Sequence, residues 1–178
     1  DRRETVNLAG RPEHSTVQRE LRDVGYEAVH LGRATHAVHL LSPWCPSRLP
    51  GVVDFLDAAR GVGIKLALAS ASRNARLVLE RLELSNYFDA IGDGYSVVNT
   101  KPAPDLFLWV VGRLNVYPQH AVVFEDAEAG IDAALKGGFW TVGLGTANIA
   151  HAHLTAAGLH ELTVDKVLDG LNDKQRAT

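Results

Sequence analysis

From residue 50 onward, short apolar runs alternate with segments in which apolar side chains recur at helical spacing. Turn-bounded apolar runs predict buried strands at residues 64–69, 90–93, 122–124 and 140–144. Helical spacing predicts helices at residues 51–60, 74–82, 102–114, 128–136 and 164–171. This alternation predicts an α/β fold, in which a mostly parallel sheet carries helices on both faces.

The first 50 residues have a different pattern. Apolar spacing predicts one helix near residues 17–24 and a second over residues 27–41. Residues 42–50 hold three prolines and no periodic pattern, which is typical of a linker. We therefore expect two parts, residues 1–45 and residues 46–178.

Composition excludes several classes of protein. The formal net charge is −3, which gives no general electrostatic case for binding nucleic acid. No apolar run approaches the roughly 20 residues that span a membrane. Cys45 is the only cysteine, so neither an internal disulfide nor a cysteine zinc site is expected, and a cytoplasmic protein is predicted. We expect a monomer.

Polar side chains follow three of the predicted elements. Ser70 ends one strand and Ser72 begins the next helix, where hydroxyl and N–H groups bind phosphate or simply cap the helix. Lys101 precedes a proline and could neutralise a phosphate, although such lysines are commonly surface residues. Glu125 and Asp126 end the 122–124 strand, where they could bind Mg²⁺ or merely open the following helix. Together, the three positions indicate a Mg²⁺-assisted phosphate site.

Other polar residues have simpler interpretations. His36 and His39 lie three residues apart, but no further ligand accompanies them, so we expect both to face solvent. His151 and His153 are expected in a surface loop. Asp93 lies between two glycines, a composition typical of a turn.

In order and wording, three stretches of the chain resemble the haloacid dehalogenase superfamily of phosphotransferases, and within it they look most like the β-phosphoglucomutases. They are ALASASRN at residues 67–74, YFDAI at 87–91 with KPAPDLF at 101–107, and EDAEAGI at 125–131. The resemblance covers about residues 50–145. It implies a haloacid-dehalogenase-like parallel sheet preceded by a partial helical cap, to which residues 1–45 would belong.

The resemblance also implies roles for individual residues. Ser70 would bind the transferring phosphoryl group, and Lys101 would balance charge beside it. Glu125 and Asp126 would hold Mg²⁺. Further contacts to phosphate or sugar would come from Ala71, Ser72, Arg73 and Asn74, and from Arg11 in the cap.

The implied reaction is phosphoryl transfer on a small sugar phosphate, through an aspartyl-phosphate, which converts β-glucose 1-phosphate to glucose 6-phosphate. One alternative is a small-molecule phosphatase of the same superfamily, in which water accepts the phosphoryl group. A second alternative is an inactive module that still binds phosphate or Mg²⁺.

One family motif has no match in this sequence. Members of the superfamily begin with an apolar strand that ends in Asp-x-Asp, whose first aspartate is the nucleophile. Asp1-Arg-Arg has no apolar run before it and cannot serve. We therefore expect the central strand, between those ending at Ser70 and Glu125, to be missing, which would leave backbone groups unsatisfied at roughly 1–3 kcal/mol each.

Two explanations for the missing motif are open: the sequence is a piece of a longer protein, or the gene product is truncated and inactive. The absence of any methionine favours the first. Either way, we expect no turnover from these 178 residues alone.

Overall fold

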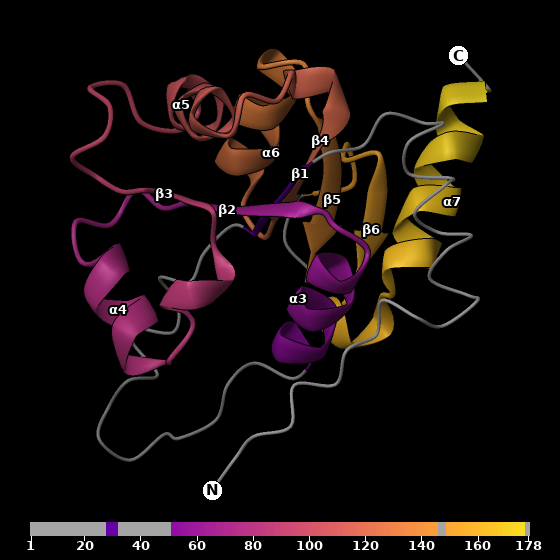
Figure 1. Ribbon diagram of the computed structural model, residues 1–178. Coiled ribbons are helices and arrows are strands. Elements are labelled where there is room, and N and C mark those ends of the chain that lie inside the picture. The colour runs from indigo at the N-terminus through magenta and orange to yellow at the C-terminus, as the bar shows by residue number, and fades with distance from the viewer. Residues whose placement is uncertain (1–27, 32–50, 146–148, 177–178) are drawn as a thin grey trace, which may run out of the picture.

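A six-stranded parallel sheet lies at the centre of the part of the chain that the computed structural model describes, residues 28–31, 51–145 and 149–176. Its strands are Ala28–Leu31 (β1), Lys65–Ala69 (β2), Ala90–Gly92 (β3), Ala121–Glu125 (β4), Trp140–Leu144 (β5) and Leu154–Ala156 (β6). They lie in the order β3-β2-β1-β4-β5-β6, and every neighbouring pair is parallel (Figure 1). The carboxyl ends of these strands therefore share one edge of the sheet.

Helices cover both faces of this sheet (Figure 1). The longer ones are Val52–Gly61 (α3), Ala75–Arg81 (α4), Asp105–Leu114 (α5), Glu128–Lys136 (α6) and Val164–Arg176 (α7). Three short 3₁₀ helices are also described: Ser85–Tyr87 (η2), Pro118–His120 (η3) and Leu159–Glu161 (η4). One face packs against α3, α4 and α7, and the other packs against α5 and α6. The predicted α/β fold class is confirmed.

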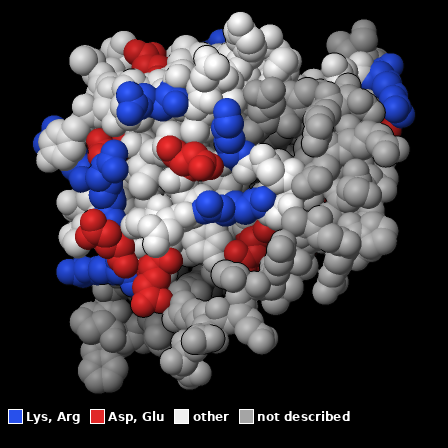
Figure 2. Space-filling view, viewed as in Figure 1, with Lys and Arg blue, Asp and Glu red and all other residues white. Residues whose placement is uncertain are grey.

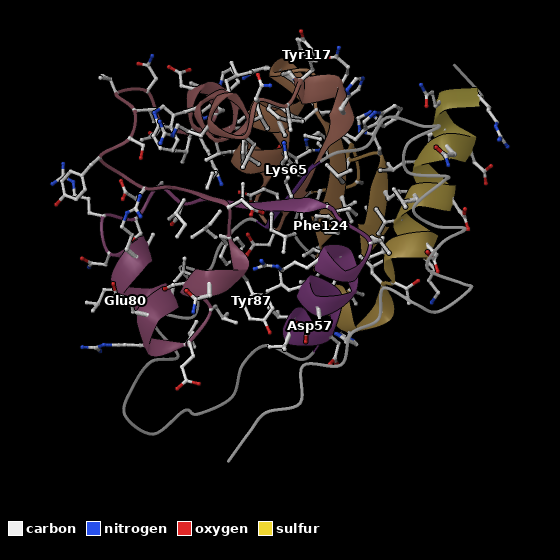
Figure 3. All side chains as sticks on the ribbon, viewed as in Figure 1. Asp57, Lys65, Glu80, Tyr87, Tyr117 and Phe124 are labelled. Atoms are coloured by element: carbon white, nitrogen blue, oxygen red, sulfur yellow. The ribbon has the colours of Figure 1, made fainter. Side chains whose placement is uncertain are left out.

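The two faces of the sheet differ in side-chain size. Successive strand residues point to opposite faces, so the leucines of β2 pack on the α3 side and its alanines on the α5 side. Phe124 of β4 also lies on the α3 side (Figure 3). The centre of its ring is 5.2 Å from the centre of the Phe55 ring, in an edge-to-face arrangement. On the other face, the small alanine side chains leave room for the buried ring of Phe107 in α5.

Strand β1 corrects two expectations. Residues 28–31 form a strand and not the helix predicted over 27–41, and they occupy the central position that was expected to be empty. Leu31 pairs in register with Leu68 of β2 and Phe124 of β4. The neighbouring strands β2 and β4 are buried, and their backbone N–H and C=O groups need partners. Pairing with both strands therefore outweighs the weak helix preference of residues 28–31.

The boundaries elsewhere follow the sequence pattern with three differences. Helix α5 begins at Asp105 and not at residue 102, because prolines at positions 102 and 104 disfavour helical backbone in the residue before each of them. Strand β6 lies in the polar, histidine-bearing segment that was expected to be a loop. Helix α7 continues five residues beyond the predicted end, to Arg176.

The remaining N-terminal predictions concern residues outside the described part of the chain. They are the helix near 17–24, the linker at 42–50 and the boundary between residues 45 and 46. Four residues of the range assigned to the cap, 28–31, belong to the core sheet.

The described surface is mixed in charge. Figure 2 shows basic and acidic side chains interspersed on the face in view. In the described ranges, no helix is long and apolar enough to cross a bilayer.

Candidate functional site

Two polar residues lie at the ends of the strands on either side of β1. Ser70 directly follows β2, and Glu125 is the last residue of β4. With about 4.8 Å between neighbouring strands, the axes of β2 and β4 are roughly 10 Å apart at this edge. The parallel sheet thus brings together two residues that are 55 positions apart in the sequence.

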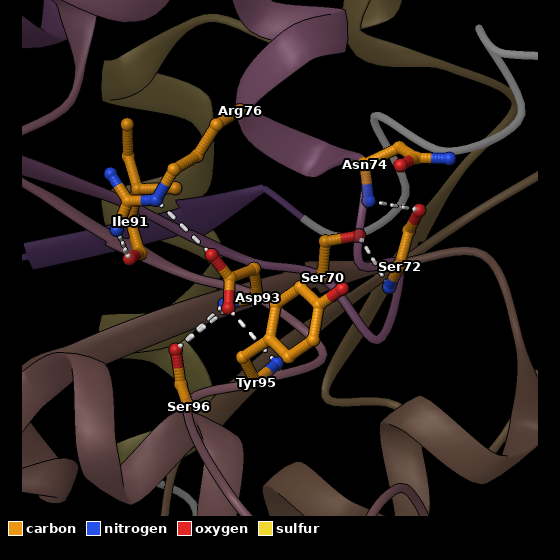
Figure 4. Close-up of polar contacts among 8 residues, drawn as sticks. All are labelled: Ser70, Ser72, Asn74, Arg76, Ile91, Asp93, Tyr95 and Ser96. Carbon is orange, nitrogen blue, oxygen red and sulfur yellow. Dashed lines mark hydrogen bonds and ion pairs between the residues drawn. The ribbon is translucent and has the colours of Figure 1, made fainter.

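Ser70 organises the backbone of residues 70–74. Its side chain is buried, and its Oγ accepts a hydrogen bond from the N–H of Ser72 at 3.2 Å. The Oγ of Ser72 in turn accepts one from the N–H of Asn74 at 3.2 Å (Figure 4). Asn74, at the N-cap position of α4, makes no side-chain cap bond. These serines therefore shape the loop before the helix, which goes beyond simple helix capping.

Four of the other predicted phosphate contacts differ in exposure. Ala71, Arg73 and Asn74 are exposed, and Ser72 is half-buried. The structure thus presents the loop to solvent while its Ser70 anchor stays buried.

Half-buried Lys101 and buried Glu125 form an ion pair. The Lys101 ammonium contacts Oε1 of Glu125, and it lies 4.8 Å from the centre of the Phe107 ring. The exposed fraction is 14% for the lysine side chain and 1% for the glutamate side chain. Lys101 comes from the segment between β3 and α5, so this pair joins that segment to the end of β4.

The second carboxylate oxygen of Glu125 lies over the start of α6. Oε2 accepts hydrogen bonds from the N–H groups of Asp126 at 3.1 Å and Ala127 at 3.3 Å. A Cβ added to Gly130 would lie 2.2 Å from the Glu125 carboxyl carbon. Residue 130 must therefore be glycine for Glu125 to take this position. This role of Gly130 was not predicted from the sequence, in which its signal is a glycine five residues after the end of the strand.

Comparison with known proteins decides the family. Residues 15–138 match the protein family described as haloacid dehalogenase-like hydrolase. The chain belongs to this haloacid dehalogenase-like family. The resemblance predicted from the three stretches is thereby confirmed.

Two curated relatives and one solved structure are similar to this chain in sequence. The chain is 45% identical over 91 residues to a phosphorylated carbohydrates phosphatase of Thermotoga maritima, covering 50% of this chain and 42% of the relative. It is 42% identical over 97 residues to a β-phosphoglucomutase of Bacillus subtilis, covering 54% and 43%. A crystal structure of β-phosphoglucomutase from Clostridium difficile superposes with a TM-score of 0.68 at 37% identity, covering 71% of this chain and 57% of that one. The chain thus spans less than half the length of these two curated relatives.

The candidate metal ligands of this haloacid dehalogenase-like protein are two adjacent carboxylates, Glu125 and Asp126. Among the described residues, no group of three or more His, Cys, Asp or Glu side chains is arranged to hold an ion. Mg²⁺ commonly binds through one or two carboxylates, with waters and substrate phosphate completing the octahedron. Two hard oxygen donors at a strand end fit that pattern in type, although both oxygens of Glu125 already accept hydrogen bonds from protein donors.

A second buried carboxylate, Asp93, lies beside the Ser70 loop at the end of β3 (Figure 4). Its Oδ2 accepts a hydrogen bond from Arg76 Nε at 3.1 Å, and its Oδ1 accepts from the N–H of Tyr95 at 3.0 Å and the hydroxyl of Ser96 at 3.2 Å. Burial raises the pKa of this carboxyl, but the bonds from Tyr95, Arg76 and Ser96 and the Arg76 charge outweigh burial, so the pKa lies below its usual 3.8. The expected turn is present, and the residue also has a set of partners that the sequence analysis did not foresee.

The histidines expected in a surface loop differ from each other. His151 is exposed and lies 3.1 Å from Asp132. His153 is half-buried, and its Nδ1 lies 3.1 Å from the N–H and 2.8 Å from the hydroxyl of buried Thr141. Its ring also packs on Trp140. The prediction of a surface loop is confirmed for His151 and holds in part for His153, which lies in the loop but is half-buried.

The other predicted residues, Arg11, His36, His39 and Cys45, lie outside the described part of the chain. Their predicted roles remain expectations. In sequence, Gly32 and Arg33 follow β1, and no Asp-x-Asp occurs anywhere in the 178 residues.

Proposed function

We propose that this chain supplies the phosphate-binding and metal-binding part of a site for phosphoryl transfer on a small sugar phosphate. The supporting observation is the ion pair of half-buried Lys101 and buried Glu125, at the sheet edge where Ser70 also lies. A lysine next to one carboxylate has further donor capacity, because an ammonium has three N–H donors. A phosphate oxygen entering this edge would meet a positive charge in a poorly solvated place, where electrostatic attraction is strong.

Ser70 would act as a hydrogen-bond donor to the phosphoryl group. Its Oγ already accepts the Ser72 N–H, so its own proton is directed to a different partner. The exposed side chains of Arg73 and Asn74 would contact the phosphate or the sugar from the same loop. In this proposal the loop binds and orients the substrate, while Lys101 compensates charge.

Glu125 and Asp126 would hold Mg²⁺, as their position and donor type favour. When bound, the ion would supply charge compensation for the phosphoryl oxygens. Gly130 supports this arrangement indirectly, since it gives the Glu125 carboxylate its place over α6.

The proposed reaction is the conversion of β-glucose 1-phosphate to glucose 6-phosphate by a protein that combines this chain with an Asp-x-Asp strand end. Similarity to two proteins named β-phosphoglucomutase supports this substrate. An aspartyl-phosphate would need an Asp-x-Asp strand end, and this sequence contains none. The 178 residues alone are therefore expected to bind phosphate without turning substrate over.

A sugar-phosphate phosphatase is the second candidate. The relative with 45% identity is named as a phosphatase of phosphorylated carbohydrates, which favours hydrolysis as much as isomerisation. A third candidate is an inactive module that keeps phosphate or Mg²⁺ affinity.

Calorimetric titration of the chain with inorganic phosphate, with and without Mg²⁺, tests the binding proposal. We expect Mg²⁺ to strengthen phosphate binding and Ser70→Ala to weaken it about tenfold, since a hydrogen bond to a charged group is worth about 1.5–3 kcal/mol. Asp126→Asn should remove the Mg²⁺ effect. The matched controls, Ser85→Ala and Asp132→Asn, should behave like the unmodified chain. Equal phosphate affinity in Ser70→Ala and Ser85→Ala would contradict the proposal.

The reaction itself is tested by supplying β-glucose 1-phosphate and measuring glucose 6-phosphate and free phosphate separately. Isomer without phosphate release supports the mutase, and phosphate release without isomer supports the phosphatase. Robust turnover by the 178 residues would show that our assignment of the missing nucleophile is wrong.

A further inference from the structure

The segment that follows β3 packs backbone to backbone against the Ser70 loop. The N–H of Ser70 donates to the carbonyl of Gly92 at 3.0 Å, and the N–H of Gly94 donates to the carbonyl of Ser72 at 3.2 Å. A Cβ on Gly94 would lie 2.6 Å from the carbonyl oxygen of Ala71, so the contact leaves no room for a side chain. The position of residues 70–74 thus depends on the position of residues 92–96.

Asp93 fixes the second of these segments and joins it to helix α4. Its carboxylate accepts from the Tyr95 N–H and the Ser96 hydroxyl, and its own N–H donates to the Ser96 Oγ at 3.0 Å. Its other oxygen binds Arg76, in the first turn of α4, whose guanidinium also donates to the carbonyl of Ile91 at 2.9 Å. Because α4 begins directly after the Ser70 loop, these contacts constrain the loop from both of its sides (Figure 4).

The same segment positions a predicted substrate contact. The Arg73 guanidinium lies 5.2 Å from the centre of the Tyr95 ring, and Tyr95 is 72% exposed. A cation held over an aromatic face keeps its charge while losing conformational freedom. Arg73 is therefore oriented by the residue whose N–H binds Asp93.

We propose that Asp93 is a positioning residue for the phosphate-binding loop at residues 70–74: it holds Ser70 and Arg73 in place without touching the substrate. This inference rests on the proposed function. Both carboxylate oxygens of Asp93 already bind protein donors, and the negative charge of this carboxylate would repel a phosphate. Its effect on binding is therefore transmitted through the loop.

Asp93→Asn tests this inference, and Asp89→Asn is its matched control. Asp89 also accepts a backbone N–H, that of Leu66 at 2.8 Å, but it precedes β3 and lies at the opposite edge of the sheet. In Asp93→Asn an amide NH₂ replaces one carboxylate oxygen. This NH₂ cannot accept the hydrogen bonds that the oxygen accepted from protein donors, so the loop should be released. At a temperature where both variants are folded, we expect about tenfold weaker binding of inorganic phosphate in Asp93→Asn and unchanged binding in Asp89→Asn.

Amide hydrogen exchange gives a readout that does not depend on phosphate. The N–H groups of Ser72 and Gly94 should exchange at least about tenfold faster in Asp93→Asn than in Asp89→Asn. Arg76→Gln, which changes an exposed side chain, should speed exchange of the same N–H groups by about threefold and serves if Asp93→Asn does not fold.

The outcomes separate the two proposals. If the unmodified chain binds no phosphate, the proposed function fails, while the exchange data still decide whether Asp93 positions the loop. Unchanged exchange at Ser72 and Gly94 in both Asp93→Asn and Arg76→Gln would overturn the inference. Equal effects of Asp89→Asn and Asp93→Asn on exchange would also overturn it, because they would reveal only a general loss of stability.

Discussion

Glu125 and Asp93 are two buried carboxylates at the same edge of the sheet, and they differ mainly in their cations. Each binds one basic side chain with one oxygen and further donors with the other. The cation of Glu125, Lys101, is only 14% exposed, whereas the cation of Asp93, Arg76, is 58% exposed. Little water can reach Lys101 and Glu125 to replace a lost partner. Water does reach the guanidinium of Arg76, beside Asp93. The cost of breaking each pair should therefore differ severalfold.

Lys101→Met should have the largest effect. It leaves the Glu125 carboxylate buried without a cation, which typically lowers the free energy of unfolding by about 3–5 kcal/mol. Urea denaturation measures the loss, and Lys166→Met, in the exposed part of α7, is the control. The double variant Lys101→Met with Glu125→Gln should recover part of the loss. A change below about 1 kcal/mol in the single variant would remove the contrast between the two carboxylates.

Gly130→Ala should be next. The new methyl group would meet the Glu125 carboxylate at 2.2 Å, and overpacking of this kind costs about 1–3 kcal/mol. Gly112→Ala is a matched control in α5, because nothing lies within 4 Å of its added Cβ. Alanine there should stabilise the helix by roughly 0.5–1 kcal/mol. If thermal unfolding shows that both substitutions stabilise the protein, the Glu125 carboxylate does not lie over the start of α6.

Arg76→Gln should change global stability by less than about 1 kcal/mol, since exposed ion pairs contribute little. This is the counterpart of Lys101→Met, and urea denaturation of the two variants side by side measures the comparison directly. A loss from Arg76→Gln as large as that from Lys101→Met would mean that solvent exposure of the cation does not set the cost.

His153 extends the comparison to a half-buried titratable group whose partners are neutral, the backbone N–H and the hydroxyl of Thr141. Burial and the charge of Lys174 lower the pKa of His153 below its usual 6.5, so the folded chain disfavours the protonated ring. Its contribution to stability is present above pH 6.5 and is lost as the pH falls through the lowered pKa. Between pH 7.5 and pH 5.5, the melting temperature should fall less in His153→Asn, whose amide oxygen can still accept the Thr141 N–H, than in the unmodified chain. Exposed His160→Asn is the control, and equal pH dependence in all three proteins would contradict this account.

Much of the fold could be predicted from the sequence, because most residues of the strands from β2 to β5 are buried and apolar. The order of Ser70, Lys101 and Glu125 along the chain likewise led to the prediction of a phosphate site, which stays a prediction. By contrast, β1 has only four residues, and its character as a strand comes from pairing with β2 and β4. A short segment of that kind carries too little local signal to be separated from a helix.

The sequence by itself determined which residues could carry the chemistry, since hydroxyl, lysine and carboxylate groups follow apolar runs that must be buried. Only the tertiary structure decided how they are held. Glu125 is positioned by Gly130 and Lys101, and the Ser70 loop by Asp93 and Arg76, across separations that no local pattern contains. The physical reason is that burying a charge requires specific partners, and the parallel sheet brings those partners from different strand ends to one edge.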